Sequence, residues 1–551
     1  MSENQAATDV PVLIIGAGPT GLMMASELTR LGVRCRIIDK TAEISPLSRA
    51  LAIHARTLEI FENIGIADQF VSAGVKAHGA SFYASGKRIA HLSFDNIESR
   101  YNFALMLPQD ETESLLARHL ENLGVKVERS TELAGLTHDA GRVTATLRLP
   151  VGRSEQCTCE YLIGCDGAHS LVRSSLNLPF EGLEYEETFA LADVMVNSSL
   201  PDDELSGFAS EKGLLFFFPI THGRYRLIAD AGPAAAAHGD LTLADLQAIV
   251  DEHCGNDVRL HDPNWMTYFR IHRRQAASYR VGRVFLAGDA AHIHSPAGGQ
   301  GMNTGLQDAY NLAWKLALTI KGAVQPAVLD SYSAERHAVG RRVLKSTDAM
   351  TRVMVLRNPV AIGIRNRLAA FLSSTEMFRS LMPRTMAELT VNYRGSAIVA
   401  EHHEGIFSSL AAFSGGPRAG DRAPDADGLA IGGRQALRFF DLLRGGDHKL
   451  LLFAGANADQ SEFANLVPIA NQITAKFSRN VMTYLVLPAN SPATVPGWDG
   501  QVILDRGGAL HRSYHAVTSC AYVIRPDGYI GYHSFPASTM HLAEYLSRIF
   551  V

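Results

Sequence analysis

The most constraining feature of this chain is a glycine-rich run near its start, VPVLIIGAGPTGLMMASELTRLGVRCRIIDK at residues 10–40. A stretch rich in Val and Ile comes first, and glycines then follow at the spacing G-x-G-x-x-G. A segment of helical character and a second short apolar run ending at Asp39 complete the pattern. This order predicts a strand, a tight turn, a helix and a second parallel strand, so we expect an α/β fold that begins with a Rossmann-like domain.

Each polar or glycine position of this unit has a physical role in holding a dinucleotide. The first glycine permits the tight turn, the second lets backbone approach a pyrophosphate, and the third lets the helix pack on the strand. The helix N-terminus offers N–H groups to the phosphates, and the acid ending the second strand can accept both hydroxyls of a ribose. The cofactor-binding residues predicted here are Gly16, Gly18, Pro19, Thr20, Gly21, Asp39 and Lys40.

Two further strands of the predicted sheet also end in an acid and a glycine. Residues 161–164 lead to Asp166 and Gly167, and residues 284–287 lead to Gly288 and Asp289. In open α/β sheets, ligands bind at the carboxyl ends of the parallel strands. The sequence has no second G-x-G-x-x-G within a strand–turn–helix unit and no cysteine pair after the first helix. An enzyme with two dinucleotide domains and a disulfide reductase are therefore disfavoured.

The chain resembles the group A FAD-dependent aromatic hydroxylases, the family of p-hydroxybenzoate and phenol hydroxylases, over about residues 10–400. Three spaced motifs carry the resemblance: GAGPTG at 16–21, GCDGAHSLVR at 164–173 and GDAAHIHSPAGGQGMNTGLQDA at 288–309. Residues 48–66 and 107–120 are similar to flavin-contacting segments of that family. The resemblance implies FAD as the cofactor. It also implies NAD(P)H as the reductant and oxygenation of an aromatic substrate by O2 through a flavin C4a-hydroperoxide.

The resemblance also assigns roles to particular residues. Asp39 would bind the ribose and Asp289 the ribityl chain, while Asp166 and Gly167 would lie near the pyrophosphate and help NAD(P)H to dock. A helix is expected from residue 300 to 321, and its first N–H groups would face the negative edge of the reduced ring. The cofactor-binding residues implied in this way are Arg49, Gln109, Asp166, Gly167, Gly288, Asp289, Pro296, Gly299, Gly301, Met302 and Asn303.

Candidate catalytic residues come from the flavin segments and from the β-rich stretch 181–280. On a strand, Tyr268, Arg270 and His272 would share one face, although a solvated face is slightly favoured for them. The basic run RIHRR at 270–274 would attract an anionic substrate or NADPH, and NADPH is favoured over NADH. His292 and His294 are interpreted as residues that fix backbone near the cofactor. The predicted catalytic residues are His54, Tyr225, Arg270, His272 and Pro296, with a helix-start position for His54 and an ordinary turn for Pro296 left open as alternatives.

The predicted domain organisation has three parts. A discontinuous FAD-binding domain covers residues 1–180 and 281–400, with a helical extension, and a β-sheet substrate domain is inserted at 181–280. A boundary rich in Gly, Pro and Asp at 415–428 leads to a C-terminal domain, 415–551, that resembles the thioredoxin-like domain of some family members. Its one cysteine, Cys520, cannot form the cysteine pair of thioredoxin chemistry, so a structural or interface role is expected.

Composition disfavours several other classes of protein. The net charge is -5 and the pI is about 6.5, which disfavours nucleic acid as a partner. The six cysteines form no CxxC and no metal-ligand spacing, so we expect no metal and a cytoplasmic location. No stretch reaches the length of a membrane span. For the basic and apolar run at 352–372, core packing with an exposed basic face is favoured over a membrane-surface role.

The leading hypothesis is an FAD monooxygenase that hydroxylates a phenolic or polycyclic aromatic compound. Its partners would be that substrate and molecular oxygen, and a homodimer stays open. A flavin halogenase is disfavoured because Trp265, Trp314 and Trp498 are isolated rather than in a W-x-W-x-I-P motif. Baeyer–Villiger or epoxidising oxygenation on the same scaffold and a flavin-binding interaction protein remain as alternatives.

Overall fold

The computed structural model divides the chain into two compact units. It describes residues 8–45, 50–84, 86–210, 213–232, 239–295, 298–354, 375–403 and 415–551, with residues 362–364, 367, 368, 371 and 373. The larger unit consists of residues up to 30, 34–310 and 336–389. The smaller unit consists of residues 31–33, 311–335 and 390–551. Each unit is described by itself below.

The first sheet of the larger unit has four parallel strands at its centre, β2, β1, β10 and β17, with antiparallel strands added beside them. Its order is β16-β17-β10-β1-β2, and β9 and β8 extend it beside β10. Val12, Leu13 and Ile14 are fully buried, as expected for an apolar run in a parallel strand. The strands are β1 (Thr8–Ile15), β2 (Cys35–Ile38), β8 (Glu132–His138), β9 (Val143–Arg148), β10 (Ser154–Gly164), β16 (Arg280–Val281) and β17 (Val284–Leu286).

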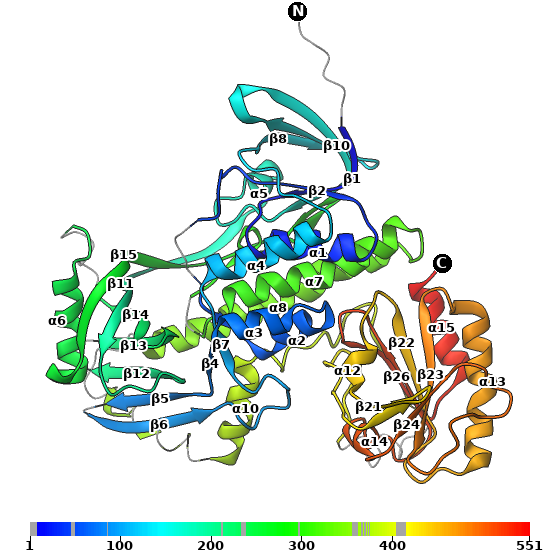
Figure 1. Cartoon of the computed structure of the whole chain (residues 1–551). Coiled ribbons are helices and arrows are strands. Elements are labelled where there is room, and N and C mark those ends of the chain that lie inside the picture. The colour runs from blue at the N-terminus through cyan, green and yellow to red at the C-terminus, as the bar shows by residue number, and fades with distance from the viewer. Residues whose placement is uncertain are drawn as a thin grey trace, which may run out of the picture. The chain divides into compact units, whose positions relative to one another are not determined.

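Helices α1 (Pro19–Arg30) and α4 (Gln109–Asn122) pack side by side against this part of the fold (Figure 1). The short helix α5 (Leu171–Ser175) follows β10, and Ser170 caps it by accepting a hydrogen bond from Arg173 N. Helix α7 (Gly301–Ile320) follows the third glycine motif, and α8 (Ala327–Met354) comes next. The expectation of a helix over residues 300–321 is therefore confirmed within one residue at each end.

The second sheet has eight strands in the order β18-β15-β11-β14-β13-β12-β5-β6. Helix α6 (Leu243–Cys254) covers one face, where its Leu246 and Val250 share a buried cluster with Leu215 and Phe217 (Figure 1). The strands are β5 (Gly79–Ala84), β6 (Lys87–Ser93), β11 (Phe180–Asn197), β12 (Glu204–Ser210), β13 (Gly213–Thr221), β14 (Arg224–Asp230), β15 (Arg259–Ala276) and β18 (His292–Ile293).

A small third sheet lies in the same unit. It contains β3 (Ala52–Ile53), β7 (Ala104–Met106) and β4 (Val75–Ala77), in that order. Its strands share a buried cluster with the second sheet and with the partly buried Phe378, Met382 and Met386. Helices α2 (Ala55–Asn63) and α3 (Ala67–Ala73) lie between β3 and β4 in the sequence. Helix α10 (Glu376–Met386) carries the three partly buried side chains.

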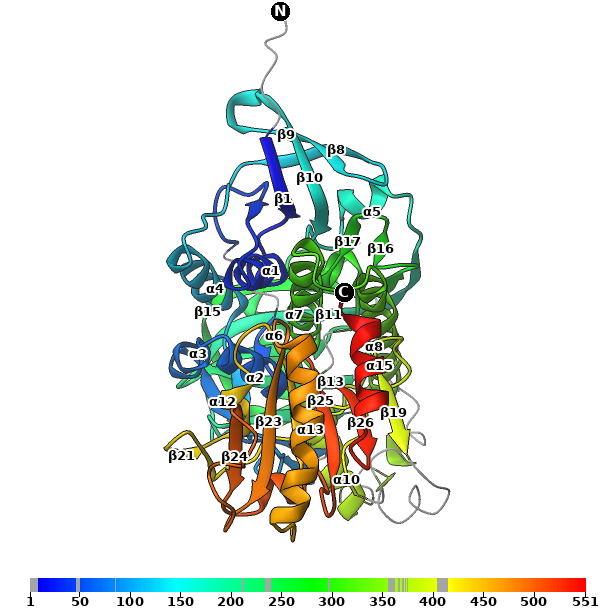
Figure 2. The same cartoon turned by 90° about the vertical axis from the view of Figure 1, so that its right-hand side faces the viewer.

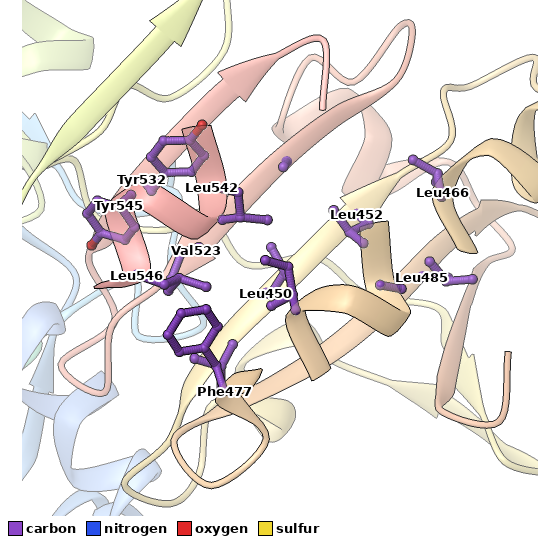
Figure 3. Packing of buried hydrophobic residues seen from close by; sticks show 14 of the residues in the cluster. Leu450, Leu452, Leu466, Phe477, Leu485, Val523, Tyr532, Leu542, Tyr545 and Leu546 are labelled. Carbon is purple, nitrogen blue, oxygen red and sulfur yellow. The ribbon is translucent and has the colours of Figure 1, made fainter. Parts of the chain in front are cut away.

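The smaller unit is built around one eight-stranded sheet, in the order β19-β26-β25-β22-β23-β24-β20-β21. Figure 2 shows α13 and α15 on the same side of this sheet, and Figure 3 shows their side chains packed on Leu450, Leu452 and Val523. The strands are β19 (Ala400–His403), β20 (Leu429–Ile431), β21 (Arg434–Leu437), β22 (His448–Phe453), β23 (Val481–Pro488), β24 (Gln501–Asp505), β25 (Cys520–Ile524) and β26 (Ile530–Phe535). The helices are α12 (Phe439–Leu442), α13 (Gln460–Phe477), α14 (Ala509–Ser513) and α15 (Thr539–Ile549).

Buried ion pairs hold the end of α7 and the start of α8 in the smaller unit. Glu335 Oε1 accepts a hydrogen bond from Arg525 Nη1 at 2.7 Å, and Lys315 Nζ donates to Glu335 Oε2 at 2.8 Å. All three side chains are at most 1% exposed. This packing explains why residues 311–335 group with the C-terminal sheet, whereas the sequence analysis assigned them to the first domain.

The mixed α/β fold predicted from the sequence is confirmed. The two compact units do not correspond one to one with the three predicted domains. The predicted domain boundaries therefore stay predictions. Among the described residues, no helix has both the length and the apolar character needed to cross a bilayer. The same part of the chain contains no group of three or more His, Cys, Asp and Glu side chains able to hold a metal ion.

Candidate functional site

Three motifs that are far apart in the sequence meet at one edge of the first sheet. Strand β10 lies between β1 and β17, with Gly164 paired to both Ile15 and Leu286. The backbone hydrogen bonding continues just beyond the strand ends, where Cys165 N donates to Ile15 O at 2.7 Å and Ala287 N donates to Gly164 O at 3.0 Å. Since all three strands run in the same direction, the residues after them converge at the carboxyl edge, where α/β proteins bind ligands.

Two glycines of the first motif are in close contact with other backbone, and one has open space around it. Gly16 has a φ of +100°, and a Cβ added there would lie 2.3 Å from Cys165 O. A Cβ added at Gly21 would lie 1.9 Å from Gly16 O. A Cβ at Gly18, by contrast, would meet no atom within 4 Å. The first and third glycines therefore allow close packing, while the second leaves backbone open to a ligand.

Asp39 is fixed at the end of β2 with its carboxylate beside the glycine turn. Its Oδ2 accepts a hydrogen bond from Ala17 N at 2.7 Å, and its Oδ1 accepts bonds from Thr41 N at 2.8 Å and Thr41 Oγ1 at 2.7 Å. A carboxylate has about four lone-pair sites, so it keeps capacity for a ribose hydroxyl. The neighbouring Lys40 is exposed.

The second motif contributes a partly buried carboxylate. Asp166 Oδ2 accepts a hydrogen bond from Val172 N at 3.1 Å, whereas its buried Oδ1 has no partner among the described residues. Burial raises the pKa of Asp166 above its usual value. Such an oxygen is suited to a donor that comes from outside the protein.

Arg173 joins the second motif to the third. Its guanidinium donates to Ala290 O at 2.9 Å and to Ala168 O at 2.8 Å, and it stacks on the Phe180 ring at 3.8 Å from the centroid. The turn at Asp166 and Gly167 is thereby held against the turn at Gly288 and Asp289. The resemblance assigned only Asp166 and Gly167 of this motif to the cofactor, and the contacts alone show the link through Arg173.

A buried carboxylate that the sequence analysis did not single out organises the third motif. Asp308, in the first half of α7, accepts hydrogen bonds from Gly288 N at 3.0 Å, His292 Nε2 at 2.7 Å and Arg336 Nε at 2.6 Å. Although burial by itself would raise the pKa of Asp308, Arg336 and His292 lower it overall. Asp308 thus holds the Gly288 turn and leaves the exposed Asp289 at its tip. Its place in the motif LQDA was the only signal in the sequence.

His54 and Asn303 fix the loop that precedes α7. His54 Nε2 donates to Gly298 O at 2.8 Å, and His54 N donates to Asn303 Oδ1 at 2.9 Å. Asn303 Nδ2 in turn donates to Ala52 O at 2.8 Å and to Gly299 O at 2.9 Å. Burial lowers the pKa of His54 to about 4, so the imidazole is neutral at pH 7. The first turn of α7 begins at the end of this loop, with unsatisfied backbone N–H groups.

His292 and His294 also act within the protein framework. His292 is bonded to Asp308, as described above, and His294 Nδ1 lies 3.1 Å from Ser295 O. Burial, and then the neighbouring His292, lower the pKa of His294 to about 4. His292 thus contacts a side chain and His294 a backbone oxygen, and the interpretation that both histidines fix backbone stays a prediction.

Ala50 connects the first sheet region to the second sheet. Gln109 N donates to Ala50 O at 3.1 Å, and Ala50 N donates to Gln109 Oε1 at 3.1 Å. From the second sheet, the buried Arg226 donates to Ala50 O at 3.2 Å and pairs with Asp193 through two bonds of 2.7 and 2.8 Å. The face of the second sheet that carries Arg226 is therefore the one beside the Ala50 segment.

The candidates Tyr225 and Tyr268 lie on one face of the second sheet, and Arg226 lies on the other. Tyr225 is buried with α6, and its hydroxyl donates to Asp202 Oδ1 at 2.6 Å, while Tyr268 packs against the same cluster. Arg226 lies opposite Phe218 and Asp193, so these residues share the other face. On β13, that face carries the half-buried Leu214, Phe216, Phe218 and Ile220. The alternation within GLLFFFPI could have predicted two faces, but not which one α6 covers.

Several predicted residues remain untested by these contacts. Arg49 and Pro296 lie outside the described residues. Arg270 is exposed and His272 is half-buried on β15, and their catalytic roles stay predictions, as do those of Tyr225 and His54. The cofactor contacts also stay predictions, although the motif residues converge at one edge of the sheet.

The chain matches the family model described as "FAD binding domain" over residues 9–347. It is 34% identical to pentachlorophenol 4-monooxygenase of Sphingobium chlorophenolicum, with 95% of this chain and 94% of the relative covered. It is also 34% identical to 6-methylpretetramide 4-monooxygenase of Streptomyces rimosus, with coverages of 98% and 93%.

Solved structures have the same fold over nearly the whole chain. The anhydrotetracycline hydroxylase OxyS of Streptomyces rimosus superposes with a TM-score of 0.76 at 30% identity, covering 98% of this chain and 99% of that one. Aklavinone-11 hydroxylase, solved with FAD and aklavinone, gives 0.76 at 25% identity, with 99% of each chain covered. The protein thus belongs to the FAD-dependent aromatic monooxygenases, as the resemblance implied.

The residues at this edge fit FAD on structural grounds. The open approach at Gly18, the partnerless oxygen of Asp166 and the exposed Asp289 offer backbone and carboxylate groups to a dinucleotide with hydroxyl groups. The Rossmann order of β1, α1 and β2 supplies a helix N-terminus for the pyrophosphate.

Proposed function

We propose that this protein hydroxylates a phenolic or polycyclic aromatic compound, using NAD(P)H and molecular oxygen. The observation that carries the proposal is the half-buried apolar row of β13, which shares a sheet face with Arg226 and thereby lies beside the Ala50 segment. Ligand sites for apolar molecules are lined mainly by aromatic and aliphatic side chains with a few polar groups. Relatives named for pentachlorophenol and for tetracycline precursors support an aromatic substrate.

In this function, the bound FAD supplies hydride acceptance and oxygen activation. The chain's own groups bind and orient it. Asp39 accepts from the ribose hydroxyls, Asp289 from the ribityl hydroxyls, and backbone at Gly18 approaches the pyrophosphate. The N–H groups of residues 301–303, at the start of α7, stabilise negative charge on the reduced ring edge.

His54 acts through the loop rather than on the substrate. Its neutral imidazole donates to Gly298 O, and its backbone N–H is bound by Asn303. One contact holds the end of the loop at Gly298 and the other holds Asn303 in the first turn of α7, so both are fixed to His54. We therefore expect His54 to position the flavin-contacting backbone.

The decisive experiment is an aerobic turnover screen of the purified holoenzyme with NADH and NADPH over phenols and polycyclic aromatics. Substrate-stimulated cofactor oxidation with a product gaining one oxygen and retaining its ring carbons supports hydroxylation. A ring-expanded ester or lactone indicates Baeyer–Villiger chemistry instead. If no aromatic compound raises NAD(P)H oxidation, the proposed function is wrong.

We also propose that residues 415–551 form a thioredoxin-like domain without redox activity. Strands β23, β22, β25 and β26 are adjacent, with β22 parallel to β23 and antiparallel to β25, and α13 follows β22. The segment from β22 to α13, residues 454–459, is AGANAD and carries no cysteine. Burial raises the pKa of the Cys520 thiol on β25. A Cys520→Ser variant should keep full NAD(P)H-dependent turnover, and loss of turnover with an unchanged melting temperature would contradict the proposal.

A further inference from the structure

The smaller unit has a cavity at the carboxyl ends of three neighbouring parallel strands. Strand β22 is parallel to β23, and β23 is parallel to β24 (Figure 1). The segments that follow these strands line a cavity of about 820 Å³, and its lining residues fall within 456–463, 488–492 and 505–517. All of them belong to the smaller unit. Such an edge is where α/β folds bind ligands, and the volume suits a small organic molecule.

A buried histidine–aspartate pair lines this cavity. His511 Nδ1 donates to Asp505 Oδ2 at 2.8 Å, and the two side chains are 3% and 0% exposed. Although burial by itself would raise the pKa of Asp505, the hydrogen bonds from His511 lower it overall. Because an ionised carboxylate only accepts, the ring proton lies on Nδ1, and the neutral imidazole has its acceptor at Nε2.

The second nitrogen of this imidazole has no partner in the protein. His511 Nε2 is buried, and no hydrogen bond reaches it from the described residues. The ring is held in place by Asp505 on one side and by the Phe453 ring, which packs edge-on at 5.3 Å between centroids. A buried polar atom without a partner destabilises a fold, so its presence needs a reason. A ligand in the cavity that donates to Nε2 would supply the missing bond.

The start of α13 does not offer the cavity an anion site. Asp459 Oδ1 accepts hydrogen bonds from Ser461 N at 2.8 Å and Glu462 N at 3.2 Å, so a protein carboxylate already occupies this helix N-terminus. Any anionic ligand would therefore compete with Asp459 for these donors.

The charges of the lining point the same way. Apart from histidines, the lining contains two carboxylates, Asp459 and Asp505, and one guanidinium, Arg512. Arg512 Nη1 is already bonded to Gly507 O at 2.8 Å. A carboxylate or phosphate ligand would thus meet more negative than positive charge. A neutral ligand with a hydroxyl donor fits the cavity better.

Apolar residues complete the lining. Phe463 and Ala516 are buried there, Pro488 is half-buried and Val517 is exposed. We propose that this cavity binds an aromatic compound whose free hydroxyl group donates to His511 Nε2 while its ring packs on the apolar lining. The hydroxyl is required by the acceptor, whereas the aromatic ring rests on the proposed function, which gives the enzyme aromatic substrates and products. The cavity is then a second site for such compounds, with no residue from the FAD motifs.

Hydrogen–deuterium exchange of the full-length holoenzyme without NAD(P)H tests this proposal. The probes are naphthol, naphthalene and naphthoate, which share one ring system. Naphthol should slow exchange at residues 454–460 and 508–517. Naphthalene should need a roughly tenfold higher concentration for the same protection, because it has no hydroxyl to donate. Naphthoate should protect no better than naphthalene, and stronger protection by naphthoate than by naphthol would overturn the proposal in favour of an anion site.

Two variants change the cavity in different ways. His511→Leu removes the acceptor, and Ala456→Trp adds bulk at an exposed lining residue. Each should weaken naphthol protection by about tenfold or more. The matched control is Ala475→Trp, at an exposed residue of α13 outside the lining, which should behave like wild type.

Equal melting temperatures establish that the variants are folded, and Ala456→Trp carries the test if His511→Leu is unstable. No protection in the wild type, or protection of wild-type strength in Ala456→Trp, overturns the proposal. Because the measurement needs no turnover, absent protection contradicts this second site alone. Failure of the turnover screen contradicts the proposed function alone.

Discussion

At the scale of single residues, buried charged groups organise the edge where the motifs meet. Asp308 gathers three donors from the Gly288 turn, β18 and α8, and it does so without any contact to solvent. A carboxylate in such a position is stable only because its hydrogen-bonding capacity is used and Arg336 balances its charge. Its role is to position the third motif, which makes it distinct from the residues expected to touch FAD.

Replacing Asp308 with Asn should therefore weaken FAD binding and the fold together. The change removes the charge that Arg336 needs, which costs about 3–5 kcal/mol for a buried pair. We expect a lower melting temperature and an FAD dissociation constant raised roughly tenfold or more. Flavin fluorescence titration and thermal unfolding measure the two effects. The control is Asp499→Asn, an exposed aspartate in the smaller unit, which should change neither.

Glu388 is a second buried carboxyl, and its charge is poorly compensated. Burial raises its pKa from 4.5 to about 8, although Arg336 and a hydrogen bond from Gln307 Nε2 act in the opposite direction. The folded state thus holds a proton that the unfolded state releases above pH 4.5. Stability consequently falls as the pH rises from about 4.5 to 8.

A Glu388→Gln variant should be more stable than wild type in alkaline solution. The amide stays neutral at every pH, so it avoids the cost of ionising the buried acid, up to roughly 5 kcal/mol. Urea unfolding at pH 5 and pH 9 should show a gain that is larger at pH 9. An equal difference between the two proteins at both pH values would rule out this titration as the cause.

At the scale of elements, parallel strands place distant motifs at one edge, and glycines set how close their turns approach. Gly16 and Gly21 are in contact with neighbouring backbone, whereas Gly18 faces open space. The G-x-G-x-x-G spacing therefore contains two packing positions and one position with open space around it. Replacing one glycine at a time with alanine therefore tests folding and cofactor binding separately.

Gly18→Ala and Gly21→Ala should have different consequences. At Gly21, the new Cβ would lie 1.9 Å from Gly16 O, so we expect the protein to misfold or to melt at a much lower temperature. At Gly18, the Cβ meets no protein atom, so the apoprotein should keep its melting temperature while FAD affinity falls roughly tenfold. Thermal unfolding of the apoprotein and FAD titration separate the two variants. Unchanged FAD affinity in Gly18→Ala would show that the pyrophosphate binds elsewhere.

At the scale of the whole larger unit, the second sheet turns one face to α6 and the other toward the third sheet and Ala50. The buried face holds Leu215, Phe217 and Tyr225, and the other holds Phe216, Phe218 and Arg226. The pair Arg226–Asp193 fixes this orientation through the bond to Ala50. The substrate should therefore contact the second set of residues.

A Phe216→Ala, Phe218→Ala variant should raise KM for aromatic substrates by roughly tenfold, because two apolar contacts are lost. FAD affinity and the rate of flavin reduction without substrate should stay near wild type. Tyr225→Phe is the control on the opposite face, since it removes the hydroxyl that lies within hydrogen-bond distance of Asp202 Oδ1, Leu200 O and Pro201 O and costs about 1 kcal/mol of stability. Steady-state kinetics and thermal unfolding distinguish the faces. A raised KM in Tyr225→Phe alone would instead support the predicted role of Tyr225 at the substrate.

Local sequence determined which elements form and which cofactor class they suit. The spacing of Gly16, Gly18 and Gly21 between an apolar strand and a helix, with Asp39 after the next strand, depends on interactions within about thirty residues. The order of the three motifs was enough to imply the family. The start of α7 was also predictable, because a glycine-rich loop ends where a helical pattern begins.

Tertiary structure alone decided the partners of these elements. Arg336 meets Asp308 and Arg226 meets Ala50 across separations of 28 and 176 residues, and no local pattern records such contacts. Period-2 alternation on β13 and β15 defines two faces, but α6 determines which one is buried. In the same way, apolar residues occur around much of α10, and only packing shows that Phe378 and Met382 are covered while Met377 and Leu381 are exposed. Burial depends on what packs against an element, which is a property of the whole fold.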